Sequence, residues 1–303
     1  MNNSSWTISN ETLASADATI CRPYLILWHM VLYVVPCVLC LIMLIFVTKK
    51  HTFDGSAYRY LLTNLLGADF AYFCVLILLN VQKIYDCGYE SIYGPLIESI
   101  LSHATTVLFL TLVTSIALIA VHRYMLICTR KNVEKYLTLR TTAIFCCATY
   151  VISVIFVGFN RLAGCRTQFN TVKFSTATVC SSIKAAYSPH SIYCFFCVYG
   201  VGLFYLKCIL KLRKMQFQIA TQSIAGCFQK RRIRIFYQAM GIWVSMVITL
   251  TTYRILPLAQ NKYVSTVLDV VALSCQYGIP FISLIFSTHW RKKMMREDNP
   301  AAF

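Results

Sequence analysis

Seven long apolar stretches constrain the fold of this chain more than any other feature of its sequence. A helix needs ~20 consecutive apolar residues to cross the hydrocarbon core of a bilayer, and every stretch reaches that length. Hydrophobic side chains make up 58% of the 303 residues and charged ones only 13%, which excludes an ordinary soluble domain. We therefore expect an all-α membrane protein in which seven transmembrane helices form one bundle. The stretches cover about residues 24–48, 58–81, 96–128, 141–160, 187–211, 232–257 and 264–287.

The charges predict the orientation of this bundle. Loops on the cytoplasmic side of a membrane collect Lys and Arg, and an outer amino terminus puts 20 of the 28 basic residues on that side. The glycosylation sequons at Asn2, Asn3 and Asn10 then fall outside as well. We expect a multi-pass plasma-membrane protein with an extracellular, glycosylated segment at 1–23, a membrane domain at 24–288 and a cytoplasmic tail at 289–303. Because the first 20 residues are polar, the first helix is expected to act as its own insertion signal.

The net charge of +17 raises the question of a nucleic-acid partner. The basic residues are spread over loops that flank the membrane and do not gather on one soluble face, so no nucleic acid is expected. Attraction to anionic lipid of the bilayer accounts for most of this charge. The remainder predicts a docking surface around the third inner loop, at about 212–231, where the flanking helices would extend into the cytosol as a basic rim.

Most of the fifteen cysteines lie inside the apolar stretches, where Cys behaves as a small hydrophobic residue. Only Cys21, Cys87, Cys165 and Cys180 fall in the outer segments, where oxidising conditions allow disulfides to persist. Four cysteines allow three pairings, and the sequence does not distinguish them. We favour one bridge that joins Cys87 to the second outer loop.

Short motifs occur in the second and third stretches, and single marked residues occur in the fifth and seventh. The second stretch contains Asn64-Leu-Leu-Gly-Ala-Asp69, and the third contains Val-His-Arg123-Tyr just before a basic loop. Tyr205 lies in the fifth stretch and Pro280 in the seventh. In these residues the chain resembles the rhodopsin-like (class A) G-protein-coupled receptors, and the resemblance extends over all seven stretches.

The resemblance implies a receptor, not an enzyme, that passes an extracellular signal to a heterotrimeric G protein. His122, Arg123 and Tyr124 would form its switch together with Tyr205 and Pro280, and Arg123 and Tyr205 would line a cytosolic cleft. A short amphipathic eighth helix near the carboxyl end is also implied. We expect no cofactor and no metal, because no spaced His or Cys ligands stand out on facing stretches.

The chain also departs from the family's pattern, so we expect a divergent member. In the seventh stretch, Ile279 and Ser283 replace the Asn and Tyr that surround the proline in the family's motif. Thr249 lies near the place of the family's helix-six proline, and the nearest tryptophan, Trp243, is more than a turn away. Cys197 replaces the helix-five proline, and Glu98 replaces the helix-three cysteine.

Asp69 is an ionisable residue at mid-membrane, which is costly and marks a functional candidate, with Asn64 a second polar residue on the same helix. In the family, this aspartate binds sodium with help from polar partners. Those places hold Leu112, Cys275 and Ile279 here, and a hard cation needs several oxygen ligands. We favour a protonated or hydrogen-bonded packing group, and a sodium site is the alternative.

His122 stands where the family has an aspartate that holds the neighbouring arginine as an ion pair at rest. A neutral histidine offers only a hydrogen bond, and a protonated one repels the arginine. We expect a weaker resting lock, and therefore either raised basal activity or a resting state held by helix packing. The alternative is that His122 merely faces the lipid headgroups, with no effect on signalling.

Arg254, at the outer end of the sixth stretch, is the first candidate for ligand binding. A guanidinium can hold a carboxylate or phosphate with two parallel hydrogen bonds, which favours an anionic ligand such as an acidic small molecule, a nucleotide or a lipid. Its place and the Val-His-Arg-Tyr spelling resemble the nucleotide and carboxylate branch of the family. Asp269 falls at the same depth and could pair with Arg254 instead. Glu98 and His103 are further candidates, although a lone His at such a place is more often a satisfied core group.

Other classes of protein fit the sequence less well. A transporter would show related halves with broken helices, and a membrane enzyme would show a nucleophile with its base, or a metal cluster, at one depth. A seven-helix receptor that is chemosensory, or that does not signal, is the remaining alternative.

Overall fold

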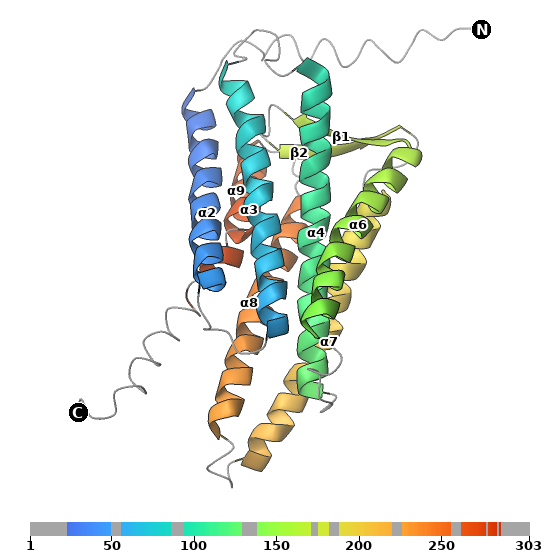
Figure 1. Ribbon diagram of the computed structural model, residues 1–303. Coiled ribbons are helices and arrows are strands. Elements are labelled where there is room, and N and C mark those ends of the chain that lie inside the picture. The colour runs from blue at the N-terminus through green and yellow to red at the C-terminus, as the bar shows by residue number, and fades with distance from the viewer. Residues whose placement is uncertain are drawn as a thin grey trace.

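The computed structural model describes residues 23–49, 56–85, 94–128, 138–170, 175–181, 188–219, 226–255, 262–276, 278–283 and 285. Seven long helices form a bundle within this part of the chain (Figure 1). Their bounds agree with the seven apolar stretches to within a few residues at most ends. The helices are α2 (Pro23–Lys49), α3 (Ser56–Tyr85), α4 (Gly94–Cys128), α6 (Leu139–Leu162), α7 (Pro189–Ile219), α8 (Gly226–Ile255) and α9 (Lys262–Gln276).

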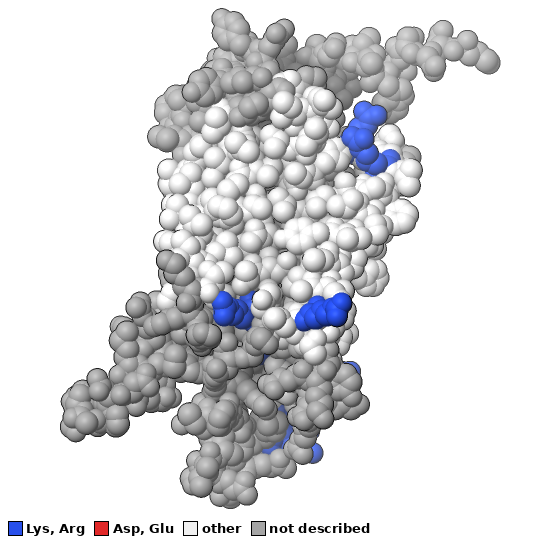
Figure 2. Space-filling view, in the orientation of Figure 1, with Lys and Arg blue, Asp and Glu red and all other residues white. Residues whose placement is uncertain are grey.

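Six of these helices, all except α9, are long and apolar enough to cross a membrane. α9 is shorter, but residues 278–283 beyond it are again helical. Many large apolar side chains point away from the bundle, for example Val35, Leu206 and Phe281. Figure 2 shows this surface as a wide white band between basic side chains near its two ends. Such a band matches the hydrocarbon layer of a bilayer, and the chain is a multi-pass membrane protein.

The core lies where α3, α4, α7 and α8 face one another. α3 packs between α2 and α4, and α4 also contacts α6, α7 and α8. Fully buried Leu65 and Phe73 of α3 and Leu112 of α4 belong to this core, as do Tyr205 of α7 and Phe236 of α8. The central place of α4 puts the arginine motif near its end within reach of several neighbouring helices.

Helices α7 and α8 extend beyond α4 at the end of the bundle that carries Arg123 (Figure 1). The loop expected at about 212–231 is therefore mostly helical, because α7 continues to Ile219 and α8 begins at Gly226. Both helices continue past their candidate membrane spans, which end at Lys214 in α7 and begin at Ile235 in α8; that this extension lies in the cytosol stays a prediction.

A two-stranded hairpin lies at the opposite end, which we call the hairpin end. β1 (Cys165–Asn170) pairs antiparallel with β2 (Ser175–Cys180), and Cys165 faces Cys180 in the register. Gly164 enters the hairpin at a φ of 72°, in the left-handed region that favours glycine. The sequence did not predict these strands.

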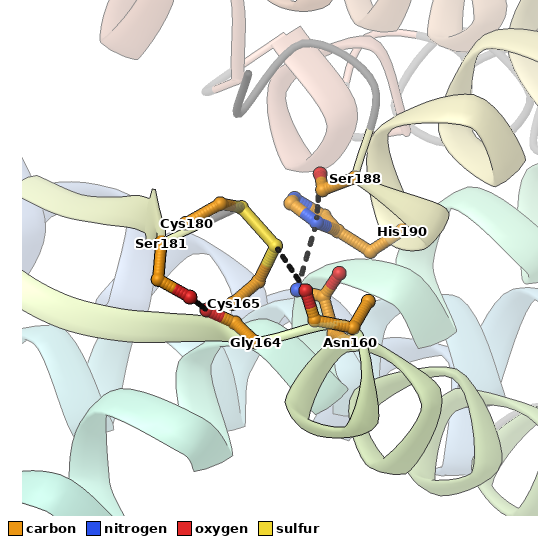
Figure 3. The surroundings of a disulfide bond; sticks show 8 residues. Asn160, Gly164, Cys165, Cys180, Ser181, Ser188 and His190 are labelled. Atoms are coloured by element: carbon orange, nitrogen blue, oxygen red, sulfur yellow. Dashed lines mark hydrogen bonds between the residues drawn. A yellow bond between two sulfur atoms is a disulfide. The ribbon is translucent and has the colours of Figure 1, made fainter. Parts of the chain in front are cut away.

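A disulfide joins Cys165 to Cys180 at the base of the hairpin (Figure 3). Our expectation that Cys87 bridges to this loop is wrong, because both cysteines of the loop pair with each other. The hairpin is tied to α4 by a hydrogen bond instead: the hydroxyl of Thr106 donates to that of Thr167 over 3.1 Å. Cys21 and Cys87 lie outside the described residues.

Candidate functional site

Arg123 lies near the end of α4 and is almost completely buried, with 4% of its surface exposed. Its guanidinium carbon is 3.7 Å from the ring centroid of Tyr58, which belongs to the first turn of α3. The ring of His122 stacks on the ring of Tyr58, with 6.4 Å between the ring centroids and 13° between the ring planes. An aromatic face attracts a cation, and most strongly where water is excluded. A tyrosine thus contacts the arginine, whereas in the family that the chain resembles an acidic residue, at the place of His122, holds it.

The polar atoms around Arg123 are poorly satisfied. Four of these atoms have no hydrogen-bond partner within the described residues: Nε and Nη2 of Arg123, Nδ1 of His122 and the hydroxyl of Tyr205. No carboxylate of those residues forms an ion pair with Arg123. Each buried polar group without a partner costs ~1–3 kcal/mol. Groups of this kind can accept new partners if the helices separate.

His122 faces the interior, with 5% of its surface exposed. The alternative that it merely faces lipid headgroups is therefore wrong. Tyr124, two residues on, turns to α7 and packs edge-on against Phe204 at 5.3 Å. The three residues of the motif thus point in different directions, and only two of them lie at the tyrosine of α3.

Tyr205 of α7 lies in a group of aromatic rings contributed by α8. Its ring is 5.7 Å from Phe236 and 5.3 Å from Trp243. Trp243 donates its indole N–H to the carbonyl of Val198 over 2.7 Å. Gly202 allows this approach, since a Cβ there would lie 3.0 Å from the tryptophan ring. Trp243 therefore fixes α8 to the backbone of α7 above Tyr205.

Thr249, at the place of the family's proline, joins α8 to α9. Its hydroxyl lies 3.3 Å from the carbonyl of Ala272 and 3.0 Å from that of Ser245 within its own helix. Ser245 donates to the carbonyl of Cys275 on α9. Pro280 is buried just beyond α9. Polar contacts to the α9 backbone thus occupy the segment where a proline kink would be expected.

Asp69 is fully buried in α3 and accepts a hydrogen bond from the thiol of Cys40 on α2 over 3.3 Å. Its other oxygen has no partner among the described residues. Nearby, Asn64 donates to Ser115 of α4 over 2.9 Å. These contacts fit the hydrogen-bonded packing group that we favoured. No group of three or more His, Cys, Asp or Glu in the described part of the chain is arranged to hold a metal ion.

The ligand candidates lie on three helices, α4, α8 and α9. Arg254 is half-buried near the end of α8 and donates through Nη2 to the carbonyl of Ser191 on α7 over 3.0 Å. Glu98 is half-buried near the start of α4. Asp269 belongs to α9, but its side chain lies outside the described residues, and its pairing with Arg254 stays a prediction.

His103 uses both ring nitrogens within the protein. Nδ1 donates to the carbonyl of Ser99 over 2.6 Å, and Nε2 accepts from Nε of Arg161 on α6 over 3.2 Å. This favours the structural alternative over a direct ligand contact.

A second polar group at this end joins α6 to α7 (Figure 3). Nδ1 of His190 lies 3.1 Å from the amide nitrogen of Asn160 and 3.0 Å from the hydroxyl of Ser188. Ser188 and Asn160 are both buried. This contact fixes the start of α7 beside the disulfide.

Two residues of these sites escaped sequence reasoning. Tyr58 is an aromatic residue in an apolar stretch, where such residues are common. Arg161 is one of several basic residues near the outer loops, and nothing in the sequence distinguishes it from the others. The expected glycosylation sites at Asn2, Asn3 and Asn10 and the eighth helix lie outside the described residues.

Comparison with known proteins supports the fold. No protein-family model and no curated protein matches the chain. The crystal structure of squid rhodopsin is one of the solved structures that match, with a TM-score of 0.65 and 14% sequence identity. The match covers 89% of this chain and 83% of the rhodopsin chain. The chain therefore has the seven-helix fold of rhodopsin; at this identity the likeness shows the fold alone.

Proposed function

We propose that the protein is a plasma-membrane receptor that couples an extracellular ligand to heterotrimeric G proteins. The observation that carries the proposal is the buried Arg123, held by the face of Tyr58 at 3.7 Å and not by a carboxylate of the described residues. The hairpin end is extracellular in this proposal, as the charge distribution favours. The end with Arg123 faces the cytosol.

Signalling in this proposal is a shift between two packings of one bundle. In the resting packing, the ring of Tyr58 covers Arg123, the ring of His122 stacks on Tyr58, and Tyr205 packs against Phe236 of α8. Outward movement of α8 would expose the guanidinium and the Tyr205 hydroxyl to the cytosol. Backbone carbonyls at the end of a G-protein helix could then accept the hydrogen bonds that these groups lack.

That Arg123 has no acidic partner among the described residues supports raised basal activity. A cation–π contact in a dry site contributes ~2 kcal/mol. A hydrogen bond to a charged group contributes ~1.5–3 kcal/mol. Removing one partner of a buried ion pair costs more, ~3–5 kcal/mol. The resting state of this protein would thus be held less firmly than one locked by a carboxylate. Replacing His122 by Asp restores that carboxylate.

The test measures ligand-free nucleotide exchange on each class of Gα in membranes that contain the full chain. The wild type should activate at least one class above empty membranes, Arg123→Ala should abolish this activity, and His122→Asp should lower it. Arg140→Ala is the matched control, because Arg140 is an exposed arginine at the same end of the bundle. If no class responds to the wild type or to Tyr58→Leu, the protein is a seven-helix protein without G-protein signalling.

We further propose that the ligand is anionic and binds at Arg254. The half-buried guanidinium is held at one nitrogen by the Ser191 carbonyl, which leaves a fixed cation at the hairpin end of α7 and α8. Nucleotides, dicarboxylates and acidic lysolipids should be screened on the wild type, and any agonist should lose most of its potency on Arg254→Ala. An agonist whose potency is unchanged by that substitution binds elsewhere.

A further inference from the structure

The hydrogen bonds of His103 position the guanidinium of Arg161. His103 lies inside the membrane-spanning part of α4, and its Nε2 accepts the Nε–H of Arg161 from α6. Its Nδ1–H is committed to the carbonyl of Ser99, which fixes the ring and its tautomer. A guanidinium is a rigid fork, so fixing Nε also fixes the direction of the two terminal nitrogens. Within the described residues, no hydrogen bond from those nitrogens is formed.

An apolar strip runs past this guanidinium, with exposed side chains of α4 on the side of the hairpin end and exposed side chains of α6 on the side of the bundle centre. On α4, Leu96 and Ile100 are 72% and 57% exposed, and helical spacing places them on the face of α4 that carries His103. On α6, Val154 is 57% exposed and lies on the face of Arg161. Water does not cover these side chains in a bilayer, so lipid must.

Gly158 leaves the face of α6 directly before Arg161 without a side chain. It lies one turn earlier on the same face of α6, and a Cβ built there would meet nothing within 4 Å. A lipid chain can therefore lie against the backbone of α6 at this place.

The charge at this place is positive. Arg161 and Arg166 are both exposed, and Figure 2 shows basic side chains together at this end, above uncharged surface. Glu98 is the acid nearest to His103 in the sequence of α4. At 100° per residue it lies ~140° around the helix from His103, away from the strip.

We propose that this strip binds a membrane lipid with an anionic headgroup. The two terminal nitrogens of Arg161 hold the headgroup phosphate, and an acyl chain lies along α4 and α6 past Gly158. Arg166 adds positive charge beside the headgroup. The site faces the leaflet at the hairpin end, and it differs from the ligand site proposed at Arg254. It does not depend on signalling.

The test uses the full chain in phosphatidylcholine nanodiscs that contain a few per cent of phosphatidylglycerol with a photoreactive acyl chain. Labelled residues are located by mass spectrometry of peptides. We expect strong labelling of α6 between residues 150 and 162, and about tenfold less on Arg161→Gln, because a charge-assisted hydrogen bond pair is lost. His103→Phe should also reduce the labelling while it leaves the charge in place, because the guanidinium loses its direction.

Matched variants separate this site from general attraction to a basic protein. Arg140→Gln removes an exposed arginine from the other end of the same helix and should leave the labelling unchanged. Gly158→Leu should reduce it by putting a side chain where the lipid chain lies against α6, whereas Gly200→Leu, which also meets open space, should not. Equal labelling by photoreactive phosphatidylcholine, or unchanged labelling on Arg161→Gln, overturns the proposal. Loss of labelling with millimolar inorganic phosphate would overturn it too, because the site would then belong to a soluble anion.

Discussion

The two ends of the bundle hold their polar groups in different ways. At the hairpin end, hydrogen bonds between side chains cross from one element to another, as from Thr106 to Thr167 and from Arg161 to His103. The disulfide closes the hairpin beside them. These contacts restrain the relative positions of α4, α6, α7 and the strands.

At the other end, the polar groups face aromatic rings. Arg123 and His122 both contact the ring of Tyr58, and several of their nitrogens have no hydrogen-bond partner in the described part of the chain. Rings hold a cation without fixing a unique hydrogen-bond geometry. The difference teaches that one end is built to keep its arrangement, whereas the other holds groups that gain partners when the arrangement changes.

The largest expected effect comes from opening the disulfide. The bridge closes a loop of 15 residues, which corresponds to ~3 kcal/mol in the chain-entropy model. The double variant Cys165→Ser, Cys180→Ser should therefore raise amide hydrogen exchange in the hairpin by about a hundredfold. Exchange near Arg123 should not change. Peptide mapping that finds Cys165 joined to Cys87 in the wild type would contradict the arrangement.

Tyr58→Leu should give the next largest effect, at the other end. Loss of a desolvated cation–π contact of ~2 kcal/mol corresponds to about a thirtyfold shift toward the state with Arg123 exposed. The readout is ligand-free nucleotide exchange on the G protein. Tyr58→Phe keeps the ring and is the control, with activity near the wild type. Equal activity of the Leu and Phe variants would show that the ring does not hold the resting state.

The sequence predicted the helices well because the bilayer imposes their length. Seven runs of about 20 apolar residues leave few arrangements, and the bounds of α4 at Gly94–Cys128 match the expected 96–128 closely. The hairpin was missed because the period-two alternation of Cys-Arg-Thr-Gln-Phe-Asn in β1 is carried by only two apolar residues, Cys165 and Phe169, and is a weak signal. Its strands are stabilised by the disulfide and by α4, which are contacts distant in sequence.

The arginine was predictable as a candidate, but its partner was not. Tyr58 meets Arg123 because α3 and α4 run antiparallel in a register set by the contact between Asn64 and Ser115. Tyr58 lies six residues before Asn64 and Arg123 eight residues after Ser115, so the two come to nearly the same depth, since helices rise equally per residue. That register comes from packing and is absent from any single stretch. The same holds for Arg161, whose partner His103 is 58 residues away.

A smaller effect is expected from the bond between α4 and the hairpin. Thr106→Val removes the hydroxyl that donates to Thr167 and keeps the shape of the side chain. The loss of a neutral hydrogen bond costs ~1 kcal/mol, so exchange in β1 should rise about fivefold. Thr105→Val is the matched control, because the Thr105 hydroxyl bonds to Ser102 within its own helix. If both variants change exchange in β1 equally, this bond does not hold the hairpin.

The smallest effect tests how firmly Trp243 is fixed between the two regions. Gly200→Ala and Gly202→Ala both replace glycine inside α7, which should gain ~0.5–1 kcal/mol from reduced backbone freedom in the unfolded chain. Gly200 meets open space and should keep the whole gain, seen as a higher thermal midpoint in nanodiscs. At Gly202 the new methyl would lie 3.0 Å from the Trp243 ring, and the ring cannot retreat freely because its N–H is bonded to Val198. The gain should therefore be cancelled at Gly202. If the two variants are equally stable, the ring yields at no cost, and Trp243 belongs to the adaptable end of the bundle and not to the restrained one.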